Sequence, residues 1–162
     1  MIYFLCICII SGSALIGKMI SRIYVKRQIF YSEMDKFCNY LKANISFFHL
    51  KISEIFSAYL NTYQSENKDV FEDFKECITK NYNDKILFRN LVFLKKDEKD
   101  MIKRFVLNIG NNCEKNQLEM LDYYCKYFEE KHNDCVKVRK DYEGLIYKIS
   151  LSIGATICIL II

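Results

Sequence analysis

The last third of the chain, residues 114–162, combines helical spacing of apolar side chains with an uncharged end. No proline interrupts this segment, and no charged residue follows Lys148. Steps of three, four and seven residues keep one apolar stripe on a single helix face. The pattern predicts one long helix whose first part packs against protein and whose end lies in a membrane. The stripe consists of Leu118, Leu121, Cys125, Phe128, His132, Cys135, Tyr142, Ile146 and Ile149.

Composition favours a helical protein and argues against several functional classes. The chain has no proline and only five glycines among 162 residues, which favours long helices over a β fold. All 24 basic and 20 acidic residues lie between Lys18 and Lys148. A net charge of +4 with interspersed signs does not indicate a nucleic-acid partner. The expected fold class is all-α, a small helical bundle between two apolar ends.

The N-terminal end, residues 1–20, reads as an uncleaved transmembrane helix. It lacks a basic start and a small-residue cleavage site, so a signal peptide is less consistent with it. Lys18, Arg22, Lys26 and Arg27 follow the apolar run. By the positive-inside rule these residues place the middle of the chain, residues 21–144, in the cytoplasm.

The C-terminal end, residues 145–162, supplies eighteen residues if Lys148 extends its ammonium to the membrane interface. That length is just enough for a second transmembrane helix, and a re-entrant or interfacial helix remains the alternative. Ser13 with Gly17, and Ser150 with Gly154, are spaced as small residues that let membrane helices approach closely.

Between the ends, the apolar spacing predicts further helices. The first membrane helix is expected to continue through residues 23–45, and shorter helices are expected at 52–60, 70–78 and 97–109. Residues 61–68 read as a loop, and residues 86–94 fit a strand or a helix equally well. Gly110 follows the 97–109 segment and is expected to cap it.

The chain contains none of the common phosphate-binding, hydrolase or metalloprotease motifs, so no cofactor, catalytic residue or metal is predicted. Its eight cysteines lack a C-x-x-C spacing, which favours buried free thiols in a reducing compartment over a disulfide framework. Cys125, His132 and Cys135 share one helix face and leave a metal site open as an alternative. Because zinc needs four ligands, packing is the preferred interpretation.

Three motifs resemble those of a known family, the stage III sporulation protein AB family of endospore-forming bacteria. SGSALIG (11–17) resembles the small-residue ending of the family's first membrane helix. ISFFHLKISEIF (45–56) resembles I-x-Y-x-H-T-P-L-x-E-A-F, with Leu50-Lys51 in place of Thr-Pro. FVLNIGNNCEKNQLEML (105–121) resembles F-x-x-x-L-G-x-[ST]-D-x-x-G-Q, with Asn112-Cys113 in place of Ser/Thr-Asp.

The resemblance implies a non-enzymatic platform subunit in the mother-cell membrane facing the forespore. Its bundle would be similar to the cytoplasmic domain of the type II secretion platform protein F. It would dock a companion sporulation ATPase and contact other membrane subunits of the channel apparatus, and it could form a homo-oligomer. The expected partner-contact residues are His49, Glu54 and Gln117, where the motifs fall on turns. The alternative is a membrane-tethered structural or sensor protein unrelated to sporulation.

Overall fold

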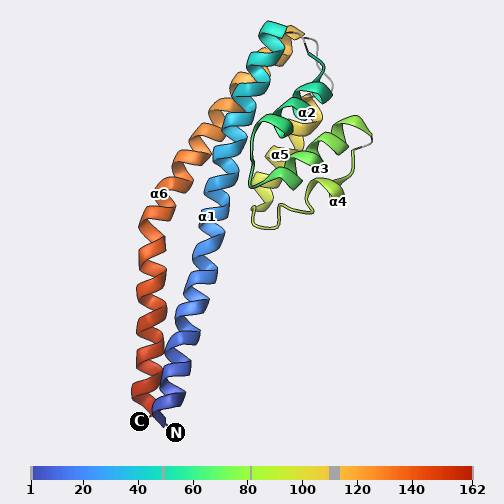
Figure 1. The fold of residues 1–162 in the computed structure, drawn as a ribbon. Coiled ribbons are helices and arrows are strands. Elements are labelled where there is room, and N and C mark those ends of the chain that lie inside the picture. The colour runs from blue at the N-terminus through green and yellow to red at the C-terminus, as the bar shows by residue number, and fades with distance from the viewer. Residues whose placement is uncertain (1, 49, 81, 110–113, 162) are drawn as a thin grey trace. The chain divides into compact units, whose positions relative to one another are not determined.

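The computed structural model describes residues 2–48, 50–80, 82–109 and 114–161, and within them every regular element is a helix (Figure 1). The all-α class expected from the sequence is confirmed over these residues. The chain divides into two compact units: a terminal unit, Met1–Gln28 with Asn133–Ile162, and a central unit, Ile29–His132. The helices are α1 (Ile2–Phe48), α2 (Ile52–Thr62), α3 (Lys68–Thr79), α4 (Asp84–Leu87), α5 (Lys96–Ile109) and α6 (Glu114–Ile161).

The helix boundaries follow the predicted segments closely. Both long helices are continuous, as the absence of proline and the helical spacing predicted. The ambiguous segment 86–94 is not a strand: it contains the end of the short helix α4 and then turns. Asn83 begins α4 because its side chain accepts a hydrogen bond from Lys85 N at 2.9 Å. Leu87 and Leu91 then anchor this segment in the core.

Aromatic rings hold α1, α2 and α3 together in the central unit. The ring of Phe37 on α1 lies 4.6 Å from that of Phe56, 4.9 Å from Tyr59 and 5.0 Å from Phe71, centroid to centroid. On α5, Phe105 packs edge-on against Phe128 of α6, with 5.2 Å between centroids. Buried aromatic side chains contribute both large apolar area and specific edge-to-face geometry. These rings explain why the short helices pack although each would be marginal alone.

One carboxylate on α1 fixes the loop between α2 and α3. Glu33 accepts hydrogen bonds from Ser65 Oγ at 2.8 Å and from Glu66 N at 2.9 Å. It also accepts from Asn67 N at 3.2 Å and from Asn67 Nδ2 at 2.7 Å. The donors come from the polar segment that the sequence predicts as a loop. Backbone groups that no helix satisfies are therefore bonded to a charged side chain instead.

In the terminal unit the first part of α1 and the last part of α6 run antiparallel and side by side (Figure 1). A Cβ added at Gly17 would overlap Ser150 Oγ and lie 3.0 Å from Ser150 Cβ. A Cβ added at Gly154 would overlap Ser13 Oγ and lie 3.3 Å from the Cα of Ile10. Each serine of one helix thus faces the glycine of the other. The two small-residue pairs therefore pack against each other within one chain.

Two helices of the described chain are long and apolar enough to cross a membrane, within Ile7–Phe48 and Leu118–Leu160. Their apolar side chains near the chain ends face outward: Leu160 is 81% exposed and Ile159 is 75% exposed. An apolar surface of this kind is costly in water and stable in lipid. These helices are consistent with a membrane protein.

Candidate functional site

The turn between α1 and α2 exposes large apolar side chains at the edge of the central unit. Ile45 is the last buried residue of α1, and the helix continues to Phe48 beyond it. Phe47 is 78% exposed and Phe48 is 68% exposed, followed by the exposed Leu50. Adjacent exposed aromatic rings on a folded body are typical of a protein contact surface. We call Phe47, Phe48 and Leu50 the apolar turn.

Hydrogen bonds fix the backbone that follows the apolar turn. Lys51 O accepts hydrogen bonds from Glu54 N at 2.9 Å and from Ile55 N at 3.1 Å, which closes the first turn of α2. Ile55 is buried, so α2 is fixed to the core, while Glu54 is exposed. A carboxylate in the first turn is favourable because it faces the positive end of the helix dipole. Glu54 is therefore an exposed carboxylate on a helix that is anchored in the core.

Of the predicted partner-contact residues, only Glu54 has a described side chain. His49 and the predicted cap Gly110 lie outside the described residues. Gln117 belongs to α6, but its side chain is outside the description as well. The prediction that these residues form a common contact surface therefore stays a prediction.

The sequence-based prediction undervalued the exposure of the apolar turn. Phe47 stands at the aromatic position of the motif in residues 45–56, and neither Phe47 nor Phe48 is among the predicted contact residues. The helical spacing gives no signal for this exposure, because Phe48 lies three residues after Ile45 and would continue the apolar face of α1. Adjacent large side chains can also both be buried on one helix, as Phe30 and Tyr31 are on α1.

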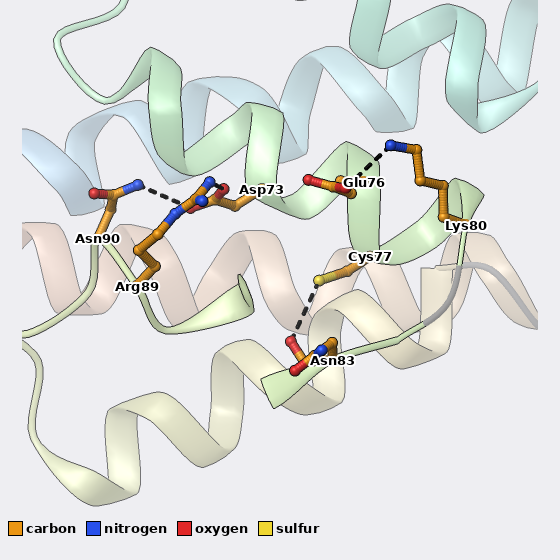
Figure 2. A network of polar contacts seen from close by, with 7 residues as sticks. All are labelled: Asp73, Glu76, Cys77, Lys80, Asn83, Arg89 and Asn90. Atoms are coloured by element: carbon orange, nitrogen blue, oxygen red, sulfur yellow. Dashed lines mark hydrogen bonds and ion pairs between the residues drawn. The ribbon is translucent and has the colours of Figure 1, made fainter. Parts of the chain in front are cut away.

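Figure 2 shows how the most buried carboxylate of α3 is satisfied. Asp73, which is 2% exposed, pairs with the guanidinium of Arg89 and accepts a hydrogen bond from Asn90 Nδ2 at 2.8 Å. At the end of the same helix, Nζ of Lys80, the residue after α3, pairs with Glu76 at 3.1 Å in a solvent-exposed contact. Asp73 is thus engaged in tying the α4–α5 connection to α3. Its geometry is that of a structural contact and presents no free carboxylate for acid–base chemistry.

A shallow groove between α2 and α3 carries charges of both signs. Lys68 and Glu72 form an exposed ion pair across one helical turn at 3.8 Å. Mixed, solvated charges of this kind favour contact with another protein over binding of a small apolar ligand. The groove is lined by Ser57, Leu60, Asn61, Lys68, Glu72, Lys75, Glu76, Thr79 and Lys80.

The alternative of a metal site at Cys125, His132 and Cys135 finds no support in the geometry. Among the described residues, no three His, Cys, Asp or Glu side chains come together as metal ligands. Cys125 instead faces Cys38 on α1, at an Sγ–Sγ distance of 2.9 Å. Cys135 is buried on the stripe, as packing would require.

Comparison with known families gives one result. A family model described as stage III sporulation protein AB matches residues 3–162, essentially the whole chain. No curated protein and no solved structure matches.

Proposed function

Because the chain belongs to the stage III sporulation protein AB family, and so has a role in sporulation, we propose that it is a non-enzymatic platform subunit of endospore formation. It docks a secretion-type ATPase at the membrane and joins other membrane subunits of the channel apparatus between mother cell and forespore. The family is not a known enzyme family. The described residues show satisfied structural polar contacts at Asp73 and Glu33, which fits a scaffold.

The observation that carries the proposal is the apolar turn on a compact helical unit. Phe47 and Phe48 are exposed although neighbouring Ile45 is buried, so the folded chain itself leaves this surface uncovered. Aromatic side chains are the residues that most often dominate protein–protein binding energy. Exposed Glu54 adds a charge beside them that a basic partner surface would match.

The proposed location is the mother-cell membrane facing the forespore, crossed twice, with the bulk of the chain in the cytoplasm. Residues 1–20 and 145–162 are the membrane-spanning segments in this proposal. Lys18 lies at the inner end of the first, and Arg22 and Lys26 follow it. Lys137 and Lys140 precede the second, and Lys148 lies near its start. Both clusters lie on the side of residues 21–144, so the positive-inside rule gives the same orientation twice.

Capture of the companion ATPase by detergent-solubilised chain tests the docking role. Replacing Phe47 and Phe48 together by Ser is expected to lower capture at least about tenfold, because losing one hot-spot side chain costs more than ~1 kcal/mol. Val92→Ser is the matched control, since Val92 is also an exposed apolar residue of the central unit, on the connection before α5. Equal capture by the double variant and the control, with native helix content, would refute the docking surface.

The predicted contact residues are tested in the same assay. His49→Ala, Glu54→Ala and Gln117→Ala are expected to weaken capture less than loss of the two aromatic rings, because polar contacts at an interface rim contribute little. In cells, deletion of the chain should arrest spore development, and the Phe47/Phe48 variant should not restore it. Full restoration by that variant would argue against docking through the apolar turn.

A further inference from the structure

Two cysteines far apart in sequence come together inside the central unit. Cys38 lies on α1 and Cys125 lies on α6, 87 residues later, and their Sγ atoms are 2.9 Å apart. Both are free thiols. A disulfide bond measures about 2.05 Å, so a small inward movement of the two side chains closes the gap. Cys38 Sγ also lies 3.7 Å from the carbonyl oxygen of Leu121, to which its thiol donates.

The two thiols differ in access. Cys38 is fully buried, whereas Cys125 is partly exposed. A small molecule in solution can therefore reach Cys125 and not Cys38. This is the arrangement of an attacking thiol with a resolving thiol behind it.

The charges around the pair favour ionisation of the accessible thiol. The hydrogen bond between the two sulfur atoms, assisted by the ammonium of Lys42, lowers the pKa of Cys125 against the opposing effects of burial, Asp35 and Asp122. The same hydrogen bond, together with burial, raises the pKa of Cys38. Lys42 on α1 is held by an ion pair with Asp122 on α6, one turn from each cysteine. The thiolate is the reactive form of cysteine.

We propose that Cys38 and Cys125 form a thiol–disulfide exchange site that closes to an intramolecular disulfide on reaction with a small disulfide. The Cys125 thiolate attacks one sulfur of the small disulfide, forms a mixed disulfide and expels one thiolate. The Cys38 thiol then gives up its proton and attacks Cys125 Sγ, expelling the second thiolate. Two electrons pass from the cysteine pair to the small disulfide, which leaves as two thiols.

Closure ties α1 covalently to α6 within the central unit. In a reducing cytoplasm the pair stays a dithiol, and it closes when the ratio of disulfide to thiol rises. The site does not depend on the proposed docking role. Cys77 offers a contrast, because its thiol is buried and donates to the carbonyl oxygen of Asn83 at 3.7 Å (Figure 2).

The full chain in detergent micelles, equilibrated with glutathione and glutathione disulfide at increasing ratios, tests the site. Remaining thiols are alkylated after acid quenching, and the products are mapped by mass spectrometry. We expect two thiols to be lost together and a peptide pair joined through Cys38 and Cys125. Cys38→Ser should instead accumulate a glutathione adduct on Cys125, and Cys125→Ser should remove the reaction at both positions. Cys77→Ser, the control, should behave as the wild type.

Two results would overturn the proposal. One is a glutathione adduct on Cys125 that persists in the wild-type chain without closing. The other is Cys125 staying reduced in the folded chain at ratios that modify it in the urea-unfolded chain. The helix content of every variant is measured by circular dichroism together with thiol oxidation. If Cys38→Ser fails to fold, the disulfide mapping of the wild type and of Cys125→Ser tests the proposal.

Discussion

Two carboxylates show how single residues join segments of the central unit. Glu33 bonds the loop between α2 and α3, and Asp73 bonds Arg89 and Asn90 beyond α4. Each lies on a helix and reaches a segment without regular structure. Asp73 is buried and Glu33 is half-buried, and carboxylates removed from water are unfavourable unless they are paired, so each position should be sensitive to loss of its partners.

Loss of Arg89, which pairs with a buried carboxylate, should lower the unfolding free energy more than loss of an exposed ion pair. Arg89→Ala leaves the buried carboxylate of Asp73 with Asn90 alone, and the unfolding free energy should fall by about 2 kcal/mol. Urea denaturation of the solubilised chain, followed by circular dichroism, measures the change. Lys80→Ala is the control, because its pair with Glu76 is exposed and should contribute less than about 0.5 kcal/mol. Equal effects of the two variants would contradict the assigned role of Asp73.

Glu33→Ala should free the loop that this carboxylate holds. Four hydrogen bonds are lost at once, and the unfolding free energy should fall by about 2–3 kcal/mol. Protease cleavage within residues 63–67 should also become faster. Glu72→Ala, which removes only an exposed pair with Lys68, should change neither measurement appreciably. An uncleaved loop in the Glu33 variant would show that other contacts hold it.

Buried tyrosines predict a loss of stability at alkaline pH. Burial, with the nearby Glu33 carboxylate, raises the pKa of Tyr59 to about 12, and burial next to Glu98 raises that of Tyr127 to about 12. The unfolded chain ionises first, near its ordinary value of about 10, so their contribution to stability is lost as pH rises from 10 to 12. Tyr59→Phe should reduce this loss by about 2 kcal/mol relative to wild type, measured as the difference in unfolding free energy between pH 9 and 12. An unchanged difference would refute the assignment to Tyr59.

At the scale of single residues, the sequence did not predict which distant side chains contact each other. The spacing places Cys125 on the apolar stripe, with packing preferred over a metal site shared with His132 and Cys135. The actual neighbour of Cys125, Cys38, is 87 residues away, and no local period reports such a pairing. Likewise, nothing in the sequence indicates that Glu33 binds the loop between α2 and α3.

At the scale of elements, the antiparallel contact of α1 and α6 in the terminal unit depends on small residues. Gly17 faces Ser150 and Gly154 faces Ser13, so each close approach uses one glycine and one serine. Lipid supplies no hydrophobic force between two apolar helices, and close backbone packing has to replace it. The sequence predicted that these positions permit close approach. It could not show that the two pairs contact each other within one chain.

Gly154→Leu should separate the two helices. The added side chain would overlap Ser13 and meet the backbone of Ile10, whose Cα lies 3.3 Å from the Cβ position. Heat stability of the helical signal in micelles should fall by an amount equivalent to about 1–3 kcal/mol. Gly12→Leu is the matched control, since nothing lies within 4 Å of a Cβ there. Comparable losses from both variants would exclude this contact as the cause.

For the whole molecule, the sequence predicted the helices and the two apolar ends, because period and charge distribution are local properties. The boundaries of α2, α3 and α5 fall within two residues of the expected segments. The structure of residues 86–94 could not be predicted, since a short apolar run fits a strand and a helix equally well. The burial of Leu87 and Leu91 in the core is visible only in the folded chain. The exposed apolar turn likewise became clear only when the burial of its neighbours was known.

The central claim is that residues 1–20 and 145–162 hold a helical body at a membrane as a mount for other proteins. Extraction of cell membranes with alkaline carbonate tests it most directly. The wild-type chain should stay in the membrane pellet, and a chain lacking both segments should appear in the supernatant. Release of the wild-type chain into the carbonate supernatant would contradict the account.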